Sequence, residues 1–133
     1  MNLSLKQAFE GEKLELERIE NLLDEARLAG VSLDAATLEM VIRKKIEGFA
    51  LLLFQSIEDI FILRELEAIT TLLDSLPFQV NIWKVQNICF QVLNSQNFAD
   101  LQEKSGQGHE EASKSVELFI RLCEKLHIKT IQD

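Results

Sequence analysis

Two histidines and one nearby glutamate are the residues whose types and spacing could hold a metal ion. Glu124 and His127 are three residues apart, an arrangement that carboxylate-bridged di-iron bundles use twice, together with two further inward-facing glutamates. This chain has the arrangement once, and its second histidine, His109, stands beside Glu110 and Glu111 in a polar segment. A two-histidine site would require the end of the chain to meet that segment. We therefore expect solvated helix ends, with no metal and no cofactor.

Paired carboxylates could hydrolyse a glycosidic bond if two of them faced each other across a cleft, about 5 to 10 Å apart. The acidic residues between positions 10 and 25 are interleaved with Lys13 and Arg18, which is typical of a solvated helix face with i,i+4 ion pairs. A serine or cysteine nucleophile would need a positioned base, and the two histidines offer no triad. The chain contains neither G-x-G-x-x-G nor G-K-[ST]. We predict no catalytic residue and expect that the chain is not an enzyme.

The most informative segment runs from residue 76 to residue 90 and contains the only proline and the only tryptophan of the chain. On a helical wheel of about 100° per residue, Gln86 lies among apolar positions. The adjacent strip combines aromatic and amide side chains: Trp83, Asn87, Phe90 and Asn94.

Two interpretations of this segment stay open. In the first, Gln86 caps a backbone carbonyl left free near Pro77, and Trp83 fills the core with its N–H satisfied. In the second, this edge contacts a sugar or an adjoining domain, because aromatic faces and amides suit both. The candidate interface or structural residues are Pro77, Asn81, Trp83, Gln86, Asn87 and Phe90.

Apolar residues recur at helical intervals along most of the chain, and they predict the elements that position this segment. A first helix over about residues 5–29 begins at a capping box formed by Ser4 and Gln7 and ends at Gly30. Gly11 either frays its first turns or separates them as a short helix. A second helix follows Asp34 and extends through residue 53.

The third helix opens on a second capping box, Ser56 with Asp59, and ends before Pro77. Asn81 caps a fourth helix that extends to about residue 103, and a flexible linker over 104–108 leads to a fifth that closes near His127. Residues 128–131 read as an extended tail. The prediction is an all-α, antiparallel bundle of about five amphipathic helices in a single domain, residues 1–133, with the second and third helices central.

Composition excludes several classes of partner. Lys and Arg number 14 against 22 Asp and Glu, so the net charge is −8, which disfavours nucleic acid and an anionic membrane surface. The residues after Met1 lack the basic and apolar regions of a signal peptide, so we expect a cytoplasmic location. Cys89 and Cys123 lie within apolar-periodic helices and are expected to be buried, reduced thiols.

The segment Pro77-x-x-x-Asn81-x-Trp83-x-x-Gln86-Asn87 resembles part of the helical C-terminal domain, itself of unknown function, that follows the catalytic barrel in glycoside hydrolase family 57-like proteins. A weaker similarity extends upstream through residues 29–34 and the helices between, so that it covers about residues 20–127. Members of that family carry their catalytic carboxylates in the barrel, which has no counterpart in this chain.

The resemblance implies a non-catalytic helical accessory domain associated with a carbohydrate-active enzyme that acts on α-glucans or related polysaccharides. The alternative is a free-standing cytoplasmic helical module that binds other proteins and forms homo-oligomers, kept in solution by its acidic surface. The expected partners are therefore the catalytic domain of such an enzyme or another copy of this chain. Both alternatives predict exposed apolar surface.

Overall fold

A computed structural model describes residues 1–11 and 14–128, and its regular elements over these ranges are all helices. The described residues form seven helices, where the sequence predicted about five. Their bounds are α1 Asn2–Glu10, α2 Leu16–Ala29, α3 Ala35–Gln55, α4 Ile60–Leu73, α5 Trp83–Leu93, α6 Gln96–Gly106 and α7 Glu110–Lys125.

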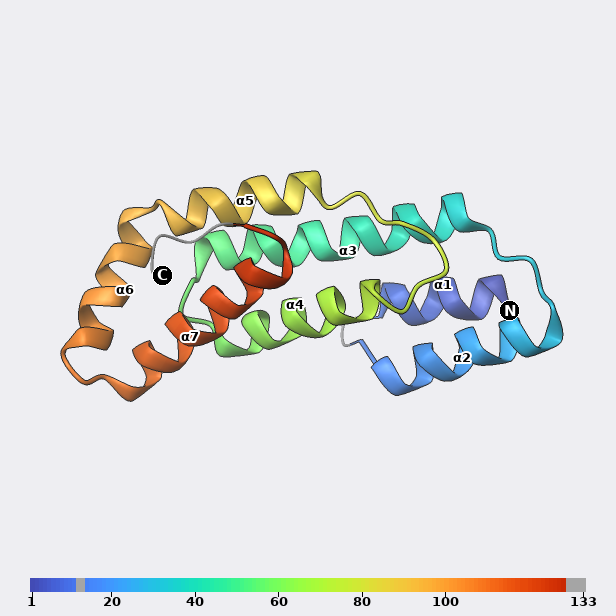
Figure 1. Ribbon diagram of the computed structural model, residues 1–133, viewed down its shortest axis with the longest axis horizontal. Coiled ribbons are helices and arrows are strands. Elements are labelled where there is room, and N and C mark those ends of the chain that lie inside the picture. Colours follow the sequence, from blue (N-terminus) through green and yellow to red (C-terminus); the bar gives the residue numbers. More distant parts are fainter. Residues whose placement is uncertain (12–13, 129–133) are drawn as a thin grey trace.

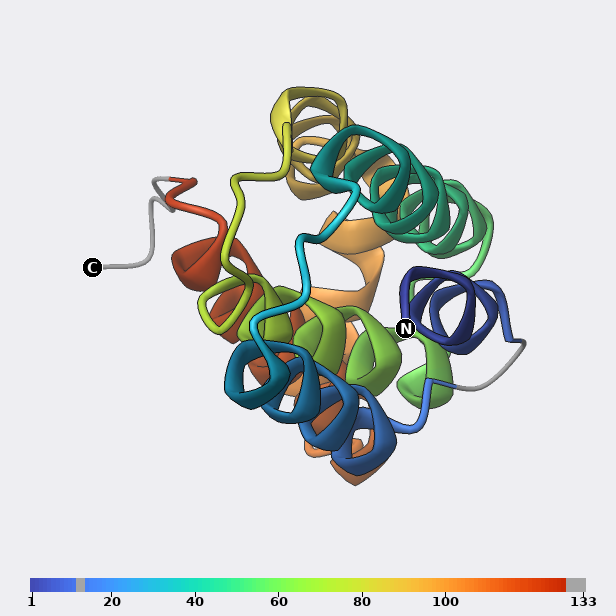
Figure 2. The same ribbon diagram turned by 90° about the vertical axis from the view of Figure 1, so that its right-hand side faces the viewer.

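The helices form two layers that run in opposite directions (Figure 1). Seen end on, α1, α3 and α5 lie opposite α2, α4 and α7 (Figure 2). The helix α3 contacts α1, α4 and α5, and α4 contacts α3 and α7. The prediction that these two helices are central is therefore confirmed.

The prediction of an antiparallel bundle holds between the layers and is wrong within them. Asn81 of the α4–α5 connection contacts Glu39, and Lys84 contacts Glu47 farther along α3, so α3 and α5 run in the same direction. In the other layer, Arg121 pairs with Glu67, and Lys125, one turn later, donates to Thr71, so α4 and α7 are parallel as well. The short helix α6 carries the chain from one layer to the other at one end, and the non-helical connection between α4 and α5 does so at the opposite end (Figure 1).

The two additional helices arise where the predicted first and fourth helices divide. The first divides after α1, whose C-terminal cap Gly11 has extended backbone angles. The fourth divides at Ser95, whose hydroxyl accepts a hydrogen bond of 3.2 Å from the amide of Phe98 and so begins α6. The predicted flexible linker over 104–108 is largely wrong, because α6 continues to Gly106 and only a tight turn separates it from α7.

Side-chain caps begin several helices, although not all at the predicted residues. The carboxylates of Asp34 and Asp59 accept hydrogen bonds from the amides of Thr37 and Ile62. The predicted start of a helix after Asp34 is thus confirmed, whereas Asp59 takes the N-cap position that the sequence assigned to Ser56. Ser56 instead ends α3. At the start of α1, the N-cap is Met1 and has no side-chain hydrogen bond, so the predicted capping box of Ser4 and Gln7 is wrong. Gly30 ends α2 in the left-handed conformation, as predicted.

The core is continuous through both layers and contains both cysteines. Phe98 of α6 and Phe119 of α7 pack with their ring centroids 4.9 Å apart. Cys89 and Cys123 are free and buried, as expected from their positions in apolar-periodic helices. Burial raises the pKa of Cys89 to about 12 and also raises the pKa of Cys123, so both thiols stay protonated.

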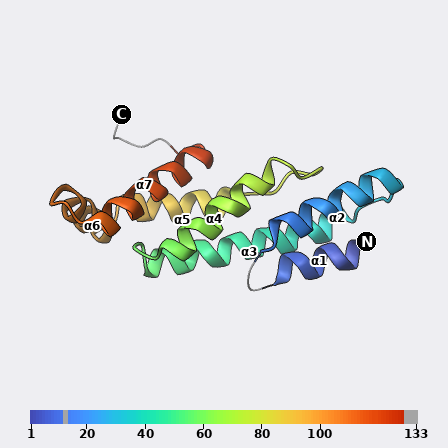
Figure 3. The ribbon, with the colours of Figure 1, turned by 90° about the horizontal axis from the view of Figure 1, so that it is seen from below.

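Paired helices close the molecule at its two ends. The hairpin of α6 and α7 lies at one end, and α1 with α2 lies at the other (Figure 3). No helix over residues 1–11 and 14–128 is both long enough and apolar enough to cross a membrane. The predicted extended tail lies outside the described residues beyond Ile128.

Candidate functional site

The candidate site is the segment from Pro77 to Asn94, and hydrogen bonds at its beginning fix the start of α5. The Asn81 side-chain oxygen accepts a hydrogen bond of 3.0 Å from the amide of Trp83, the first residue of α5, but the N-cap itself is Ile82, one residue later than predicted. The amide of Asn81 donates to the Glu39 carboxylate at 3.0 Å, and Arg43 holds that carboxylate through its Nε. The start of α5 is thereby attached to α3.

Gln86 faces inward from α5 and reaches the end of α7. Its side-chain nitrogen donates a hydrogen bond of 2.8 Å to the carbonyl oxygen of Leu126, the residue that caps α7. The first interpretation therefore described the right type of bond, a glutamine that caps a free backbone carbonyl. It named the wrong place, because the carbonyl belongs to Leu126 rather than to the chain near Pro77.

The outward face of α5 carries what we call the α5 stripe: Trp83, Asn87, Phe90 and Asn94. Trp83 is 69% exposed and Phe90 is 56% exposed. The interpretation that Trp83 fills the core is thus wrong. The physical reason is the direction of packing on α5, whose buried residues Val85, Cys89 and Val92 lie on the opposite face of the helix. Along the helix, Asn87 lies between the two rings and Asn94 lies beyond Phe90. The stripe therefore combines apolar faces with hydrogen-bonding groups.

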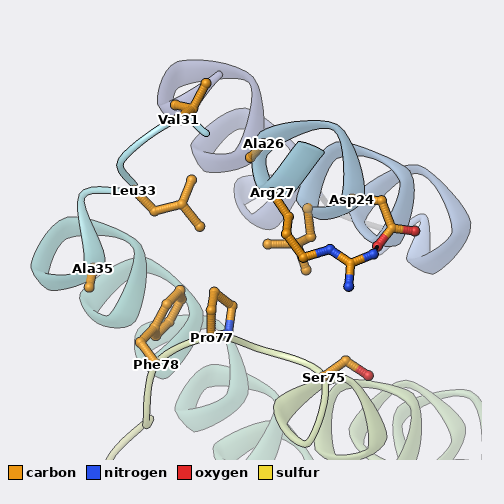
Figure 4. Close-up of a pocket in the computed structure, with 10 residues that line it drawn as sticks. Asp24, Ala26, Arg27, Val31, Leu33, Ala35, Ser75, Pro77 and Phe78 are labelled. Atoms are coloured by element: carbon orange, nitrogen blue, oxygen red, sulfur yellow. Dashed lines mark hydrogen bonds and ion pairs between the residues drawn. The ribbon is translucent and has the colours of Figure 1, made fainter. Parts of the chain in front are cut away.

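Pro77 lies apart from the α5 stripe and lines a hollow of about 420 Å³ between α2, the start of α3 and the α4–α5 connection. Its wall is mainly apolar, with Leu33 and Val31 opposite Pro77 and Phe78 (Figure 4). Of the candidate residues, four therefore lie together on or beside one face of α5: Asn81, Trp83, Asn87 and Phe90. Pro77 lies at the hollow beside α2, and Gln86 lies on the inward side of α5.

The groups considered for catalysis or metal binding do not converge. His109 caps the beginning of α7 and His127 follows its end, so the helix separates them by roughly 25 Å. Among the described residues, no three side chains of the histidine, cysteine, aspartate or glutamate type lie together as a possible metal site.

A second group of exposed apolar residues, which was not predicted as a candidate site, lies on α3. Leu51, Leu52 and Phe54 are each about half exposed, and Met40 and Gly48 are exposed on the same helix. The available signal was composition, because α3 is apolar around more of its circumference than a surface helix requires.

Compared with family models, curated proteins and solved structures, the chain shows no match. These comparisons therefore do not indicate what the site binds, and only the residues of this chain do.

Proposed function

We propose that this chain is a non-catalytic helical accessory domain that docks on the catalytic domain of a carbohydrate-active enzyme of the glycoside hydrolase family 57-like kind. The observation that supports the proposal is the α5 stripe. The segment that carries the family resemblance directs its tryptophan outward, Phe90 follows on the same face of α5, and both rings are mostly exposed.

An interface accounts for this arrangement better than solvent does. Tryptophan and phenylalanine are enriched where proteins bind one another, and buried rings contribute much of the binding free energy. Trp83 and Phe90 are seven residues apart on one helix, so their rings are about 10 Å apart along its axis. Asn87 and Asn94 add polar groups beside the rings, and Asn94 already donates to the Phe90 carbonyl at 2.9 Å, which fixes its side chain.

The proposal assigns no step of hydrolysis to this chain. The resemblance places the catalytic carboxylates in a barrel with no counterpart here, and several carboxylates of the described residues serve structural roles. Glu39 holds Arg43 and Asn81, Glu67 holds Arg121, and Asp34 caps α3. The domain contributes a surface rather than a reaction.

The proposal is tested by the mass of the native polypeptide and by the proteins that bind it. An antibody raised against this domain should detect, in source cells, either a polypeptide several times larger than 15.2 kDa or a complex of that size under native conditions. The precipitate obtained with this antibody should hydrolyse an α-glucan such as amylopectin. A precipitate that contains the domain but hydrolyses no member of an α-glucan panel would contradict the proposal.

A variant tests the surface itself. Trp83→Ala combined with Phe90→Ala should separate the domain from the enzyme, or expose the junction to protease if the two are covalently joined. The matched control is Lys84→Ala combined with Gln91→Ala, which changes exposed residues of the same helix outside the α5 stripe. Equal behaviour of the two double variants would show that the α5 stripe is not the docking surface.

The alternative function, a free-standing module that binds its own copies, draws its support from other helices, α2 and α3. Their exposed faces carry opposite charge, while the α5 stripe carries none.

A further inference from the structure

The exposed face of α3 is basic and apolar on a protein whose net charge is −8. Its exposed residues include Met40, Lys44, Gly48, Leu51 and Leu52. The two acidic residues of this helix are held elsewhere. Glu39 receives the amide of Asn81, and Glu47 lies 4.0 Å from Lys84 of α5, so both face that helix.

A hollow of about 470 Å³ adjoins this face between α1 and α3. Three lysines, Lys6, Lys44 and Lys45, line it with one glutamate, Glu10, and the remaining lining is apolar: Phe9, Met40 and Val41. Among the residues that the structure describes, none of the three ammonium groups lies within 4.0 Å of a carboxylate. This part of the surface thus combines an excess of positive charge with apolar contact area.

Gly48 leaves a notch in the middle of the face. A glycine inside a helix costs about 1 kcal/mol relative to alanine, because it loses more backbone freedom on folding. A Cβ atom at this position would meet nothing within 4 Å, so no neighbour within the chain requires the glycine. The absence of a side chain instead permits close approach from outside.

The exposed face of α2 has the complementary chemistry. Glu17, Asn21, Asp24 and Leu28 follow one another at the spacing of a single helix face. Leu28 is 83% exposed, the most of any large apolar side chain described. Over residues 1–11 and 14–128, Asp24 pairs only with the solvent-exposed Arg27 at 3.4 Å, and such surface ion pairs contribute little stability.

The spacing on the two helices also agrees. Asp24 and Leu28 are one turn apart on α2, and Lys44 and Gly48 are one turn apart in the same order on α3. When two such helices pack in parallel, the carboxylate lies beside the ammonium as the leucine lies over the glycine. Leu51 and Leu52 then flank the leucine side chain.

From these faces we propose that the chain associates with a second copy of itself, with the α2 face of one copy packed on the α3 face of the other. Each copy supplies one acidic and one basic face, so the charges attract at the contact despite the net charge of −8. The association uses neither Trp83 nor Phe90, and it is independent of docking on an enzyme.

Sedimentation equilibrium of the whole chain, from about 1 µM to about 1 mM, measures the association directly. We expect the weight-average mass to rise above 15.2 kDa with concentration. Lys44→Glu combined with Lys45→Glu should weaken the association at least about tenfold, and so should Glu17→Lys combined with Asp24→Lys, since each places like charges together. An equimolar mixture of the two charge-reversed variants should regain it.

Controls separate this contact from a loss of folding. Helix content and the midpoint of thermal unfolding should be preserved in both charge-reversed variants, whose positions are on the surface. Leu28→Ser should weaken association, while Leu3→Ser, a matched change at an exposed leucine of α1, should not. Gly48→Ala should stabilise the isolated chain and yet weaken the association.

Two outcomes would overturn the proposal. The first is a chain that stays monomeric over the whole concentration range. The second is association that neither charge-reversed variant weakens, which would place the contact on other surfaces.

Discussion

The side-chain amide of Gln86 donates a hydrogen bond of 2.8 Å to the main-chain carbonyl of Leu126, forty residues away. The last carbonyls of a helix have no partner within the helix, and this one lies at a fully buried residue. Gln86 thus caps the end of α7 from a different helix, whereas a capping residue normally lies next to the helix end in the sequence. The bond also fixes α5 against the end of α7, on the side of α5 away from the α5 stripe.

Replacement of this glutamine should destabilise the fold. We expect Gln86→Leu to lower the free energy of unfolding by about 1–3 kcal/mol, because the Leu126 carbonyl loses its partner in a buried place. Denaturant unfolding followed by circular dichroism measures the change. Gln91→Leu, at an exposed position of the same helix, is the matched control and should stay within about 0.5 kcal/mol of the wild type. A gain in stability for Gln86→Leu would refute the capping role.

Replacement of His127 by glycine should stabilise the fold. It has a φ of 62°, and the amides of His127 and Ile128 close the end of α7 by donating to the carbonyls of Glu124 and Cys123. A side chain is strained in this conformation, so His127→Gly should raise the free energy of unfolding by about 1 kcal/mol. The converse change, Gly30→Ala at a φ of 67°, should lower it by a similar amount. Thermal denaturation of both variants checks the pair, and the same sign for both would contradict the explanation.

The fluorescence of Trp83 reports on the α5 stripe without interference, because it is the only tryptophan and the chain has no tyrosine. Since the side chain is mostly exposed, its emission should resemble that of an indole in water, and acrylamide should quench it readily. Docking of a partner on the α5 stripe should shift the emission to the blue and protect it. An emission spectrum of a buried indole in the free chain would contradict the exposure of Trp83.

Glu67 should make stability depend on acid pH. Partial burial by itself raises the pKa of this carboxyl, but the hydrogen bond from Arg121 and the charge of Lys125 outweigh burial, so the pKa lies below its ordinary value. Because the pKa of Glu67 is lower in the folded chain than in the unfolded chain, the ionised carboxyl stabilises the fold at pH values above its ordinary pKa of 4.5. This stabilisation is lost as the pH falls through the folded pKa.

Glu67→Gln should therefore lower the free energy of unfolding at pH 7, by about 1 kcal/mol or less because the ion pair is partly exposed. The difference from the wild type should fade once the pH is well below 4.5, as urea titrations across that range would show. Glu103→Gln, at an exposed position on α6, serves as the control. A difference that persists unchanged in strong acid would point to a loss of packing rather than of charge.

The local features of this fold could be predicted from the sequence, and the features that depend on distant partners could not. Asp34 caps α3 and Asn81 accepts the amide of Trp83 within a few residues of themselves, so spacing alone located both helix starts, although Asp59 rather than the predicted Ser56 caps α4. The break at Ser95 was missed because a single capping serine is a weak signal, although Phe98 and Leu101 do not continue the helical register of Cys89 and Val92.

The candidate site shows the same division. The helical wheel grouped Trp83, Asn87, Phe90 and Asn94 correctly on one face of α5. It could not tell whether that face was covered, since this depends on where α3 and α7 pack. The role of Gln86 as a cap followed from its apolar surroundings, but its partner lies too far along the chain for any local pattern to indicate.

The parallel pairing of α4 with α7 determines when the core can close. Residues joined across this pair, such as Glu67 and Arg121, are 54 positions apart, whereas helices of an up-and-down bundle meet their neighbours across a short turn. During synthesis, α3 can cover one part of the apolar surface of α4, but the part that α7 covers must stay exposed until α5, α6 and α7 have left the ribosome. Folding of this chain should be slower than that of an up-and-down bundle of equal length, and the exposed part of α4 is the segment on which a chaperone would act.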